Sequence, residues 1–188
     1  MSTRFLLTPY NTKLSHSRTN FNQVSKPDIG YLPTPQATVE AMLSLANVCE
    51  SDILYDLGSG DGRFLIAAAQ RFGTRGMGVD IDPQRIDQAI ANAKQANVSD
   101  RVTFIQQNLF ESDFSEATIV VLYLLPHLNL RLRPQLLQLK PGTRILSHQF
   151  DLGNWEPHQI QVMETPEESS TLYLWIVPHE IPDYLRSH

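Results

Sequence analysis

The chain has 188 residues, of which 41% are hydrophobic and 19% charged, so its length and composition suit a single globular domain with its own core. A single cysteine excludes an internal disulfide, and no apolar run approaches the ~18 residues that cross a bilayer. Six scattered histidines without zinc-type spacing indicate no metal site, and the lone cysteine favours a reducing compartment such as the cytoplasm.

Charge is unevenly distributed along the chain. Residues 1–27 hold four of the 15 basic residues and none of the 20 acidic ones, so the remainder has 11 basic and 20 acidic residues, a net charge of −9. We expect residues 1–27 to form a basic N-terminal arm, or less favourably a transit-type segment, and residues 28–188 to form the folded domain. The acidic body argues against nucleic-acid phosphates as partners, while the basic arm keeps a nucleic-acid methyltransferase as a further alternative.

The first predicted helix starts just after residue 35. Thr34 and Pro35 are typical of an N-cap and a first-turn proline. Apolar residues then recur on one face of the following segment, namely Val39, Met42, Leu43 and Ala46. We therefore expect this helix to pack against a core.

The next segment combines a strand, a glycine-rich turn, a helix and a second strand. The apolar run Ile53–Leu57 predicts a buried parallel strand, and Arg63–Phe72 predicts the helix that follows. The sequence Asp-Leu-Gly-Ser-Gly-Asp-Gly at 56–62 joins them, with glycines that permit a sharp turn or a close approach to a ligand. The second apolar run, 76–79, ends at Asp80, which is placed to accept hydrogen bonds from ribose hydroxyls.

Glycine spacing separates the possible nucleotide ligands. A dinucleotide fingerprint reads G-x-G-x-x-G, whereas the glycines here alternate from Gly58, and Arg63 stands where the third glycine would be. Acids at Asp56 and Asp61 would repel a pyrophosphate and suit a cationic ligand. The pattern therefore predicts a nucleotide-type pocket for a ligand without phosphates.

The remaining elements predict a doubly wound sheet. Asp82 and Pro83 open a helix with one buried stripe, formed by Ile86, Ala89, Ile90 and Ala93. Further strands are expected at 102–106, 118–124 and 144–150, with a Pro141-Gly142 turn before the last, and the runs 160–164 and 172–177 predict a hairpin turning at 166–169. We expect an α/β fold with a mostly parallel, seven-stranded, Rossmann-like sheet that contains one antiparallel strand.

Strand ends then become the residues of interest, because ligands of such sheets bind beyond the carboxyl ends of the strands. They are Asp56, Asp80, Asn108, Tyr123 and the segment after Ser147.

Several motifs resemble one enzyme family. The D-x-G-x-G-x-G pattern, with Asp80 placed 18 positions after Gly62, resembles motif I and the ribose-binding acid of class I S-adenosylmethionine (SAM) methyltransferases. The sequences Y-L-P-T-P at 31–35, L-Y-L-L-P at 122–126, S-H-Q-F at 147–150 and W-E-P at 155–157 are similar to those of small protein-lysine methyltransferases. That branch includes an archaeal broad-specificity enzyme and the mitochondrial enzymes that act on the ATP synthase c-subunit and the adenine nucleotide translocase. The resemblance covers about residues 29–177.

This resemblance implies SAM as cofactor and no metal. The cofactor-binding residues that it implies are Tyr31, Thr34, Asp56, Gly58, Gly60, Asp61, Asp80, Ile81, Asn108, Leu109 and Tyr123. Many relatives have an Asp at the position of Asn108, whose amide oxygen can still accept from the adenine amino group. No N-P-P-Y or D-P-P-Y motif follows the fourth strand, which argues against adenine-N6 and glutamine-N5 acceptors.

The resemblance also implies a protein partner with an accessible lysine. A lysine amine, with a free pKa of about 10.4, must lose its proton before it can attack a sulfonium methyl, and desolvation favours the neutral amine. A channel walled by the catalytic candidates Tyr31, Tyr123 and Trp155 would desolvate it, although Trp155 is as readily a core residue. No general base is evident, and His127 and His148 are interpreted as structural.

The favoured function is therefore SAM-dependent methylation of protein lysine. A methyltransferase for a small molecule would share every cofactor motif, and a SAM-binding protein without catalysis would also satisfy them.

Overall fold

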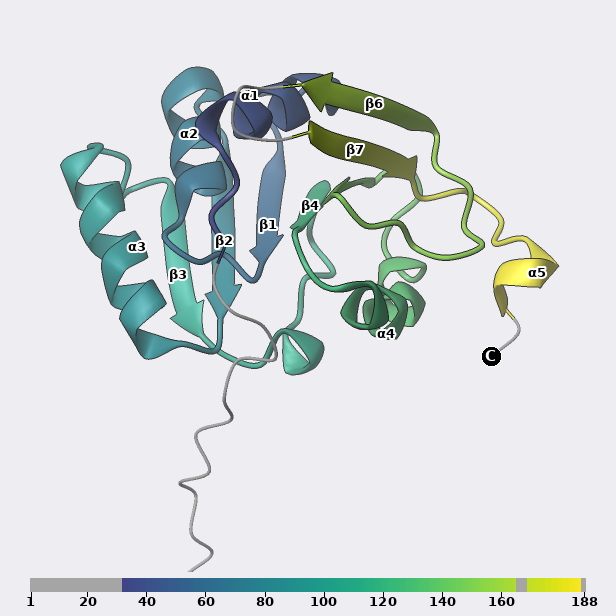
Figure 1. Ribbon diagram of the computed structural model, residues 1–188. Coiled ribbons are helices and arrows are strands. Elements are labelled where there is room, and N and C mark those ends of the chain that lie inside the picture. The colour runs from purple at the N-terminus through teal and green to yellow at the C-terminus, as the bar shows by residue number, and fades with distance from the viewer. Residues whose placement is uncertain (1–31, 165–168, 187–188) are drawn as a thin grey trace, which may run out of the picture.

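A seven-stranded sheet organises the residues that this computed structural model describes, 32–164 and 169–186 (Figure 1). Its strands are β1 Ile53–Leu57, β2 Arg75–Asp80, β3 Val102–Gln106, β4 Ile119–Leu122, β5 Arg144–His148, β6 Gln159–Glu164 and β7 Ser169–Ile176. Their order across the sheet is β3-β2-β1-β4-β5-β7-β6. β1 to β5 pair in parallel, and β7 lies antiparallel to both β5 and β6. The predicted fold, with one antiparallel strand, is confirmed.

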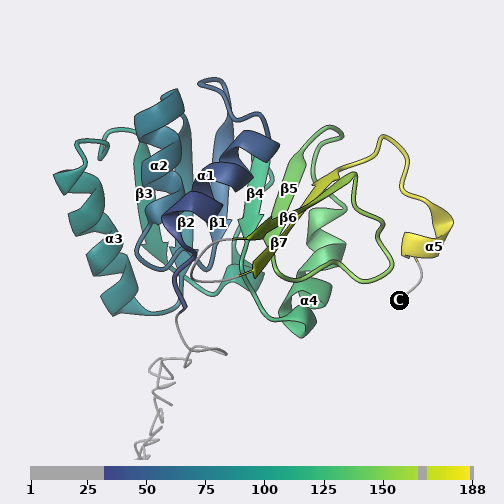
Figure 2. The same cartoon turned by 45° about the horizontal axis from the view of Figure 1, so that its top comes forward.

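Helices cover both faces of the sheet (Figures 1 and 2). They are α1 Gln36–Leu45, α2 Arg63–Phe72, α3 Pro83–Gln95, α4 Pro126–Leu136 and the short α5 Asp183–Arg186. β1 shows why two cores form: Leu54 packs with residues of α1, α2 and α3, whereas Tyr55 and Leu57 pack on the other face with residues of α4. This alternation follows from the period of two in a strand.

Two predictions about helices are wrong in detail. Thr34 does not cap α1, which begins at Gln36 after Pro35 and has no side-chain cap; the Thr34 hydroxyl instead lies 3.3 Å from His148 Nδ1. Ile90 does not belong to the buried stripe of α3, because 49% of it is exposed. α3 lies over the end of the sheet that β3 forms, so one flank of its apolar stripe has no partner (Figure 1).

Three expectations fall on residues outside the described ones: the basic arm 1–27, the position of Tyr31 and most of the turn at 166–169. Within the described ranges, no helix is long and apolar enough to cross a membrane. The same ranges contain no group of three or more side chains able to hold a metal ion.

Candidate cofactor site

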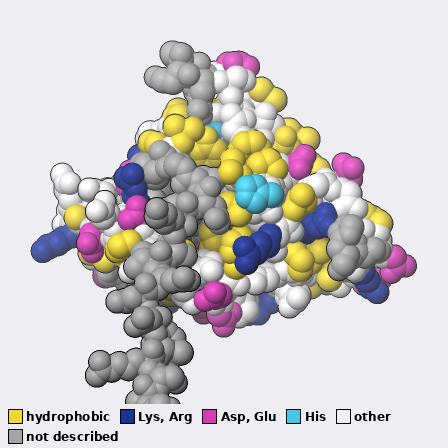
Figure 3. Space-filling model, turned by 60° about the horizontal axis from the view of Figure 1, so that its bottom comes forward, with side chains coloured by type: hydrophobic (Ala, Val, Ile, Leu, Met, Phe, Trp, Pro, Cys, Tyr) yellow, Lys and Arg dark blue, Asp and Glu magenta, His cyan; other side chains and the backbone are white. Residues whose placement is uncertain are grey.

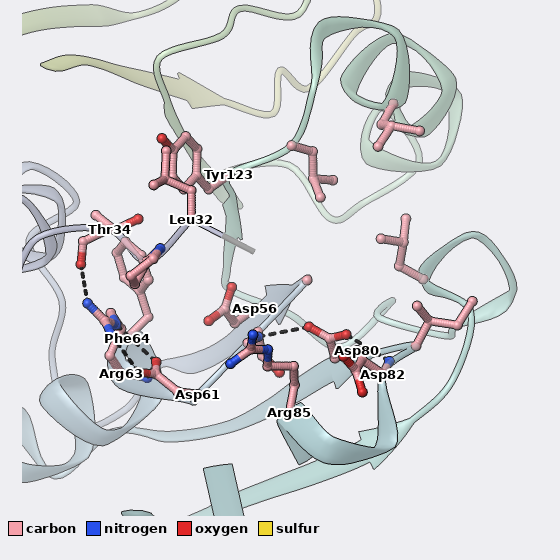
Figure 4. A pocket seen from close by; sticks show the side chains of 18 of the residues that line it. Leu32, Thr34, Asp56, Asp61, Arg63, Phe64, Asp80, Asp82, Arg85 and Tyr123 are labelled. Carbon is pink, nitrogen blue, oxygen red and sulfur yellow. Dashed lines mark hydrogen bonds and ion pairs between the residues drawn. The ribbon is translucent and has the colours of Figure 1, made fainter. Parts of the chain in front are cut away.

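A cavity of about 310 Å³ lies at the carboxyl ends of β1, β2 and β4 (Figure 4). Every predicted cofactor residue among the described ones lines it: Thr34, Asp56, Gly58, Gly60, Asp61, Asp80, Ile81, Asn108, Leu109 and Tyr123. Its other lining residues include Leu32, Arg63, Phe64, Arg85, Phe110 and Leu128. On the side toward which these strands end, hydrophobic side chains gather in the middle of the face (Figure 3).

Residues such as Leu32 and Phe110 were missed because no motif signals them. Exposed or half-buried apolar side chains have no distinctive pattern in a sequence. Their only signal is proximity to a motif residue, since Leu32 precedes Thr34 and Phe110 follows Asn108 by two positions.

The glycine-rich turn is held against β2 by its backbone. The amides of Gly58 and Ser59 both donate to the carbonyl of Val79, at 2.8 and 3.0 Å. This attachment places the turn directly beside the carboxyl end of β2. The turn and Asp80 therefore form one wall of the cavity.

Asp80 has the geometry of a ribose-binding acid. Its Oδ2 accepts from the amide of Gly60 at 2.9 Å, and its Oδ1 accepts from the amide of Asp82 at 3.0 Å. Each carboxylate oxygen can accept a further hydrogen bond, so a pair of ribose hydroxyls can donate to a carboxylate that is already oriented. The residues of this wall therefore fit the sugar of SAM.

Arg63 connects the glycine-rich turn to the segment that precedes α1. Its Nη2 and Nε bind the two carboxylate oxygens of Asp61, at 2.6 and 2.9 Å, and its Nη1 donates to the carbonyl of Thr34 at 2.6 Å. Such a bidentate pair is strongly directional. The residue that replaces the third glycine of a dinucleotide fingerprint thus fixes residues 32–34 over the cavity (Figure 4).

Asp56 is a strongly perturbed acid of the site. Only 4% of it is exposed, and burial, followed by repulsion from Asp80 and Asp61, raises its pKa to about 8. Its side chain is therefore protonated at neutral pH. An ammonium or sulfonium group in the cavity would favour its ionised form.

The free protein should lose stability as the pH rises, because of Asp56. Its pKa is 3.8 when the carboxyl is exposed in the unfolded chain and about 8 in the fold, so between these values the native state holds a proton that the unfolded state lacks. Its contribution to the free energy of unfolding should therefore fall from pH 5 to pH 8 and change little above pH 9. Urea unfolding at several pH values, compared between the wild type and Asp56→Asn, measures it. Equal pH dependence in both proteins would contradict the assignment.

Asn108 has a structural role besides its place on the cavity wall. Its Oδ1 accepts from the amide of Phe110 at 3.1 Å, which caps a 3₁₀ turn at Leu109–Glu111, and its Nδ2 donates to Glu111 Oε1 at 3.1 Å. Its observed contacts are therefore those of a polar residue that stabilises a turn. Its oxygen retains one acceptor site for an adenine amino group.

Only one of the three catalytic candidates lies on the described cavity wall. Tyr123 lines the cavity, and its ring packs against that of His148 with 4.1 Å between ring centroids. Trp155 does not line it: 5% of its surface is exposed, it packs in the core on the α4 side of the sheet, and its carbonyl accepts from Trp175 Nε1 at 2.7 Å. The core interpretation therefore describes Trp155, and Tyr31 lies outside the described residues.

His148 is buried between two hydroxyl groups, as expected for a structural histidine. Its Nδ1 lies 3.3 Å from the hydroxyl of Thr34, and its Nε2 lies 3.0 Å from that of Ser170. It thereby links the segment before α1 to β5 and β7, on the side of the cavity where Tyr123 lies.

Comparisons with known proteins agree with this geometry. A family model described as the ANTKMT methyltransferase domain matches residues 56–159. A protein-lysine N-methyltransferase of Saccharolobus islandicus is 42% identical over 153 residues, covering 80% of this chain and 95% of that protein. The adenine nucleotide translocase lysine N-methyltransferase of Mus musculus is 30% identical over 130 residues, covering 69% of this chain and 56% of that protein.

A solved structure is also similar. The crystal structure of an RNA methyltransferase from Salinibacter ruber, in complex with S-adenosyl-L-homocysteine, shares 52% identity with this chain and superposes with a TM-score of 0.78. The match covers 81% of this chain and 97% of that chain.

Proposed function

The chain belongs to the ANTKMT methyltransferase domain family and uses SAM, and from this premise we propose that it methylates the side-chain amine of lysine in a protein. The observation that carries the proposal is the 42% identity to a protein-lysine N-methyltransferase over 95% of that protein's length. The cavity at the strand ends supports it, because it combines a ribose-binding acid with an aromatic wall at Tyr123.

In the proposed mechanism, this chain's residues position the cofactor and desolvate the acceptor. Bound SAM supplies an electrophilic sulfonium methyl. Asp80 holds the ribose, and the buried Asp56 favours positive charge when ionised. Tyr123, with Tyr31 proposed as a lid, excludes water so that the neutral lysine amine is favoured. The lysine ammonium would release its proton to solvent beside Tyr123, so that its neutral nitrogen could take the methyl group that SAM would supply.

RNA is the principal alternative acceptor, because a neighbour at 52% identity carries the name of an RNA methyltransferase. Charge disfavours it: residues 28–188 have a net charge of −9, which repels a phosphate backbone. We therefore favour a protein acceptor.

We also propose that residues 28–188 form the catalytic domain and that residues 1–27 form an arm. The protein is proposed to work in the cytoplasm, where a thiol such as Cys49 stays reduced.

Transfer of labelled methyl from SAM into a whole-cell extract tests the proposal. We expect label in the protein fraction, insensitive to ribonuclease, and mass spectrometry should place it on lysine side chains. An Asp80→Ala variant, with weakened SAM binding, serves as the control. Ribonuclease-sensitive label would establish RNA as the acceptor. Label confined to small molecules would favour a small-molecule methyltransferase, and SAM binding without transfer to any acceptor would favour a non-catalytic SAM-binding protein.

A further inference from the structure

β6 is an unprotected edge of the sheet. It pairs with β7 alone among the described strands, so within the described ranges the backbone groups on its other side face no further strand. Its residues Ile160 and Val162 are 54% and 62% exposed. They lie opposite Tyr173 and Thr171 of β7, hence on one face of the hairpin. Edge strands are usually protected by Lys or Pro, and β6 contains neither.

The stretch of chain that carries this edge has acidic residues and no basic ones. Residues 145–185, which include β6 and β7, contain seven acidic residues and no lysine or arginine. Glu156 and Glu164, one on each side of the apolar pair along the chain, are both exposed. An extended apolar edge with acidic neighbours fits a basic segment of another protein. It would repel both a second copy of itself and a nucleic acid.

The edge lies within reach of the cavity. Val162 of β6 is opposite Thr171, and the adjacent Leu172 is opposite His148, whose ring packs on Tyr123 at the cavity wall. Because neighbouring strands are about 4.8 Å apart, β6 lies about 15 Å from β4, after which Tyr123 follows. A strand added to β6 lies one spacing farther out, about 19 Å from β4, and an extended segment advances about 3.3 Å per residue, so about six residues cover that distance.

We propose that the β6 edge docks an extended, basic segment of the methyl-accepting protein, which adds a strand to the sheet and presents a lysine at the cavity about six residues away. The inference rests on the proposed function and identifies how its substrate is recognised. Main-chain hydrogen bonds would supply affinity without a fixed sequence. The exposed Ile160 and Val162 would bury apolar side chains of the segment, and the acidic surroundings would select a basic one. The strand order places this hairpin at the end of the sheet opposite β3, and Figure 1 shows it on the side away from α3.

The test combines Ile160→Lys with Val162→Lys and uses two acceptors of different length. Unfractionated histones are the lysine-rich protein probe, and Nα-acetyl-lysine amide is too short to reach β6 while it occupies the cavity. We expect the double variant to raise KM for histones at least tenfold, with kcat, SAM affinity and activity on the amide unchanged. Ile90→Lys is the matched control, because Ile90 is 49% exposed on α3 at the other end of the sheet. The pair Ile160→Thr with Val162→Thr keeps β-branched residues and should raise KM in the same direction.

If KM for histones is the same in both double variants as in the wild type, β6 is not the docking surface. An equal rise of KM for histones in Ile90→Lys would also overturn the proposal. General repulsion between the added lysine and the basic histones would then explain the effect. The proposal would also fail if the wild type were a dimer and the Ile160→Lys and Val162→Lys changes dissociated it. The edge would then join two copies of this chain. If the wild type transfers no methyl to lysine in either acceptor, the proposed function itself fails.

Discussion

Replacing Asp80 with alanine should weaken SAM binding about a hundredfold. The change removes the carboxylate that both ribose hydroxyls would address, and hydrogen bonds to a charged group contribute about 1.5–3 kcal/mol each, where about 1.4 kcal/mol corresponds to a factor of ten. It also leaves the amides of Gly60 and Asp82 without their acceptor, so the wall of the cavity loses its shape. Isothermal titration with SAM measures the effect.

The neighbouring Asp82 provides a matched control for Asp80. Its carboxylate accepts from the amide of Gln84 and caps α3, so Asp82→Ala should cost about 1 kcal/mol of stability. Although Asp82 lines the same cavity, its side chain is engaged in capping the helix, and SAM affinity should stay within a few-fold of the wild type. Normal SAM binding by Asp80→Ala would refute the ribose assignment.

Local patterns explain why so much of the cofactor site could be predicted. β1, its glycine turn and α2 are consecutive in sequence, and the predicted boundaries Ile53–Leu57 and Arg63–Phe72 are those observed. Asp82 caps the helix that Pro83 opens, as the sequence indicates. In each case the signal comes from residues within one turn or strand of each other, where propensity and periodicity act.

Contacts between distant segments explain what could not be predicted. Thr34 was interpreted as a helix cap, but its hydroxyl is next to His148, 114 positions away. A threonine before a proline predicts a cap locally, and nothing in the sequence reveals a competing partner on another strand. The position of Trp155 also depends on distant segments, because its burial results from the packing of α4 and Trp175 around it. The helix α4 itself contains Pro134, which obscures its helical pattern.

The second large effect is expected at Gly62, the last glycine of the turn. Its φ of +81° disfavours any residue with a Cβ, and an added Cβ would lie 2.6 Å from Phe104 Cζ. The backbone cost is about 1–2 kcal/mol, and overpacking adds about 1–3 kcal/mol. Gly62→Ala should therefore lower the free energy of unfolding by about 3 kcal/mol, a large part of the 5–15 kcal/mol typical of a domain. Urea denaturation measures this change.

Gly142 separates the two causes, because its φ of +88° is similar but a Cβ there would meet nothing within 4 Å. Gly142→Ala should therefore show the backbone cost alone, about 1 kcal/mol. Phe104→Leu in the Gly62→Ala background should recover part of the loss, since it removes the ring atoms that the new Cβ meets. If Gly62→Ala lowers the free energy of unfolding no more than Gly142→Ala does, packing against Phe104 does not require a glycine at position 62. If the predicted difference is found, the last glycine of the motif is required by the protein's own core, even without a ligand, which explains why a glycine pattern can predict a fold before it predicts a cofactor.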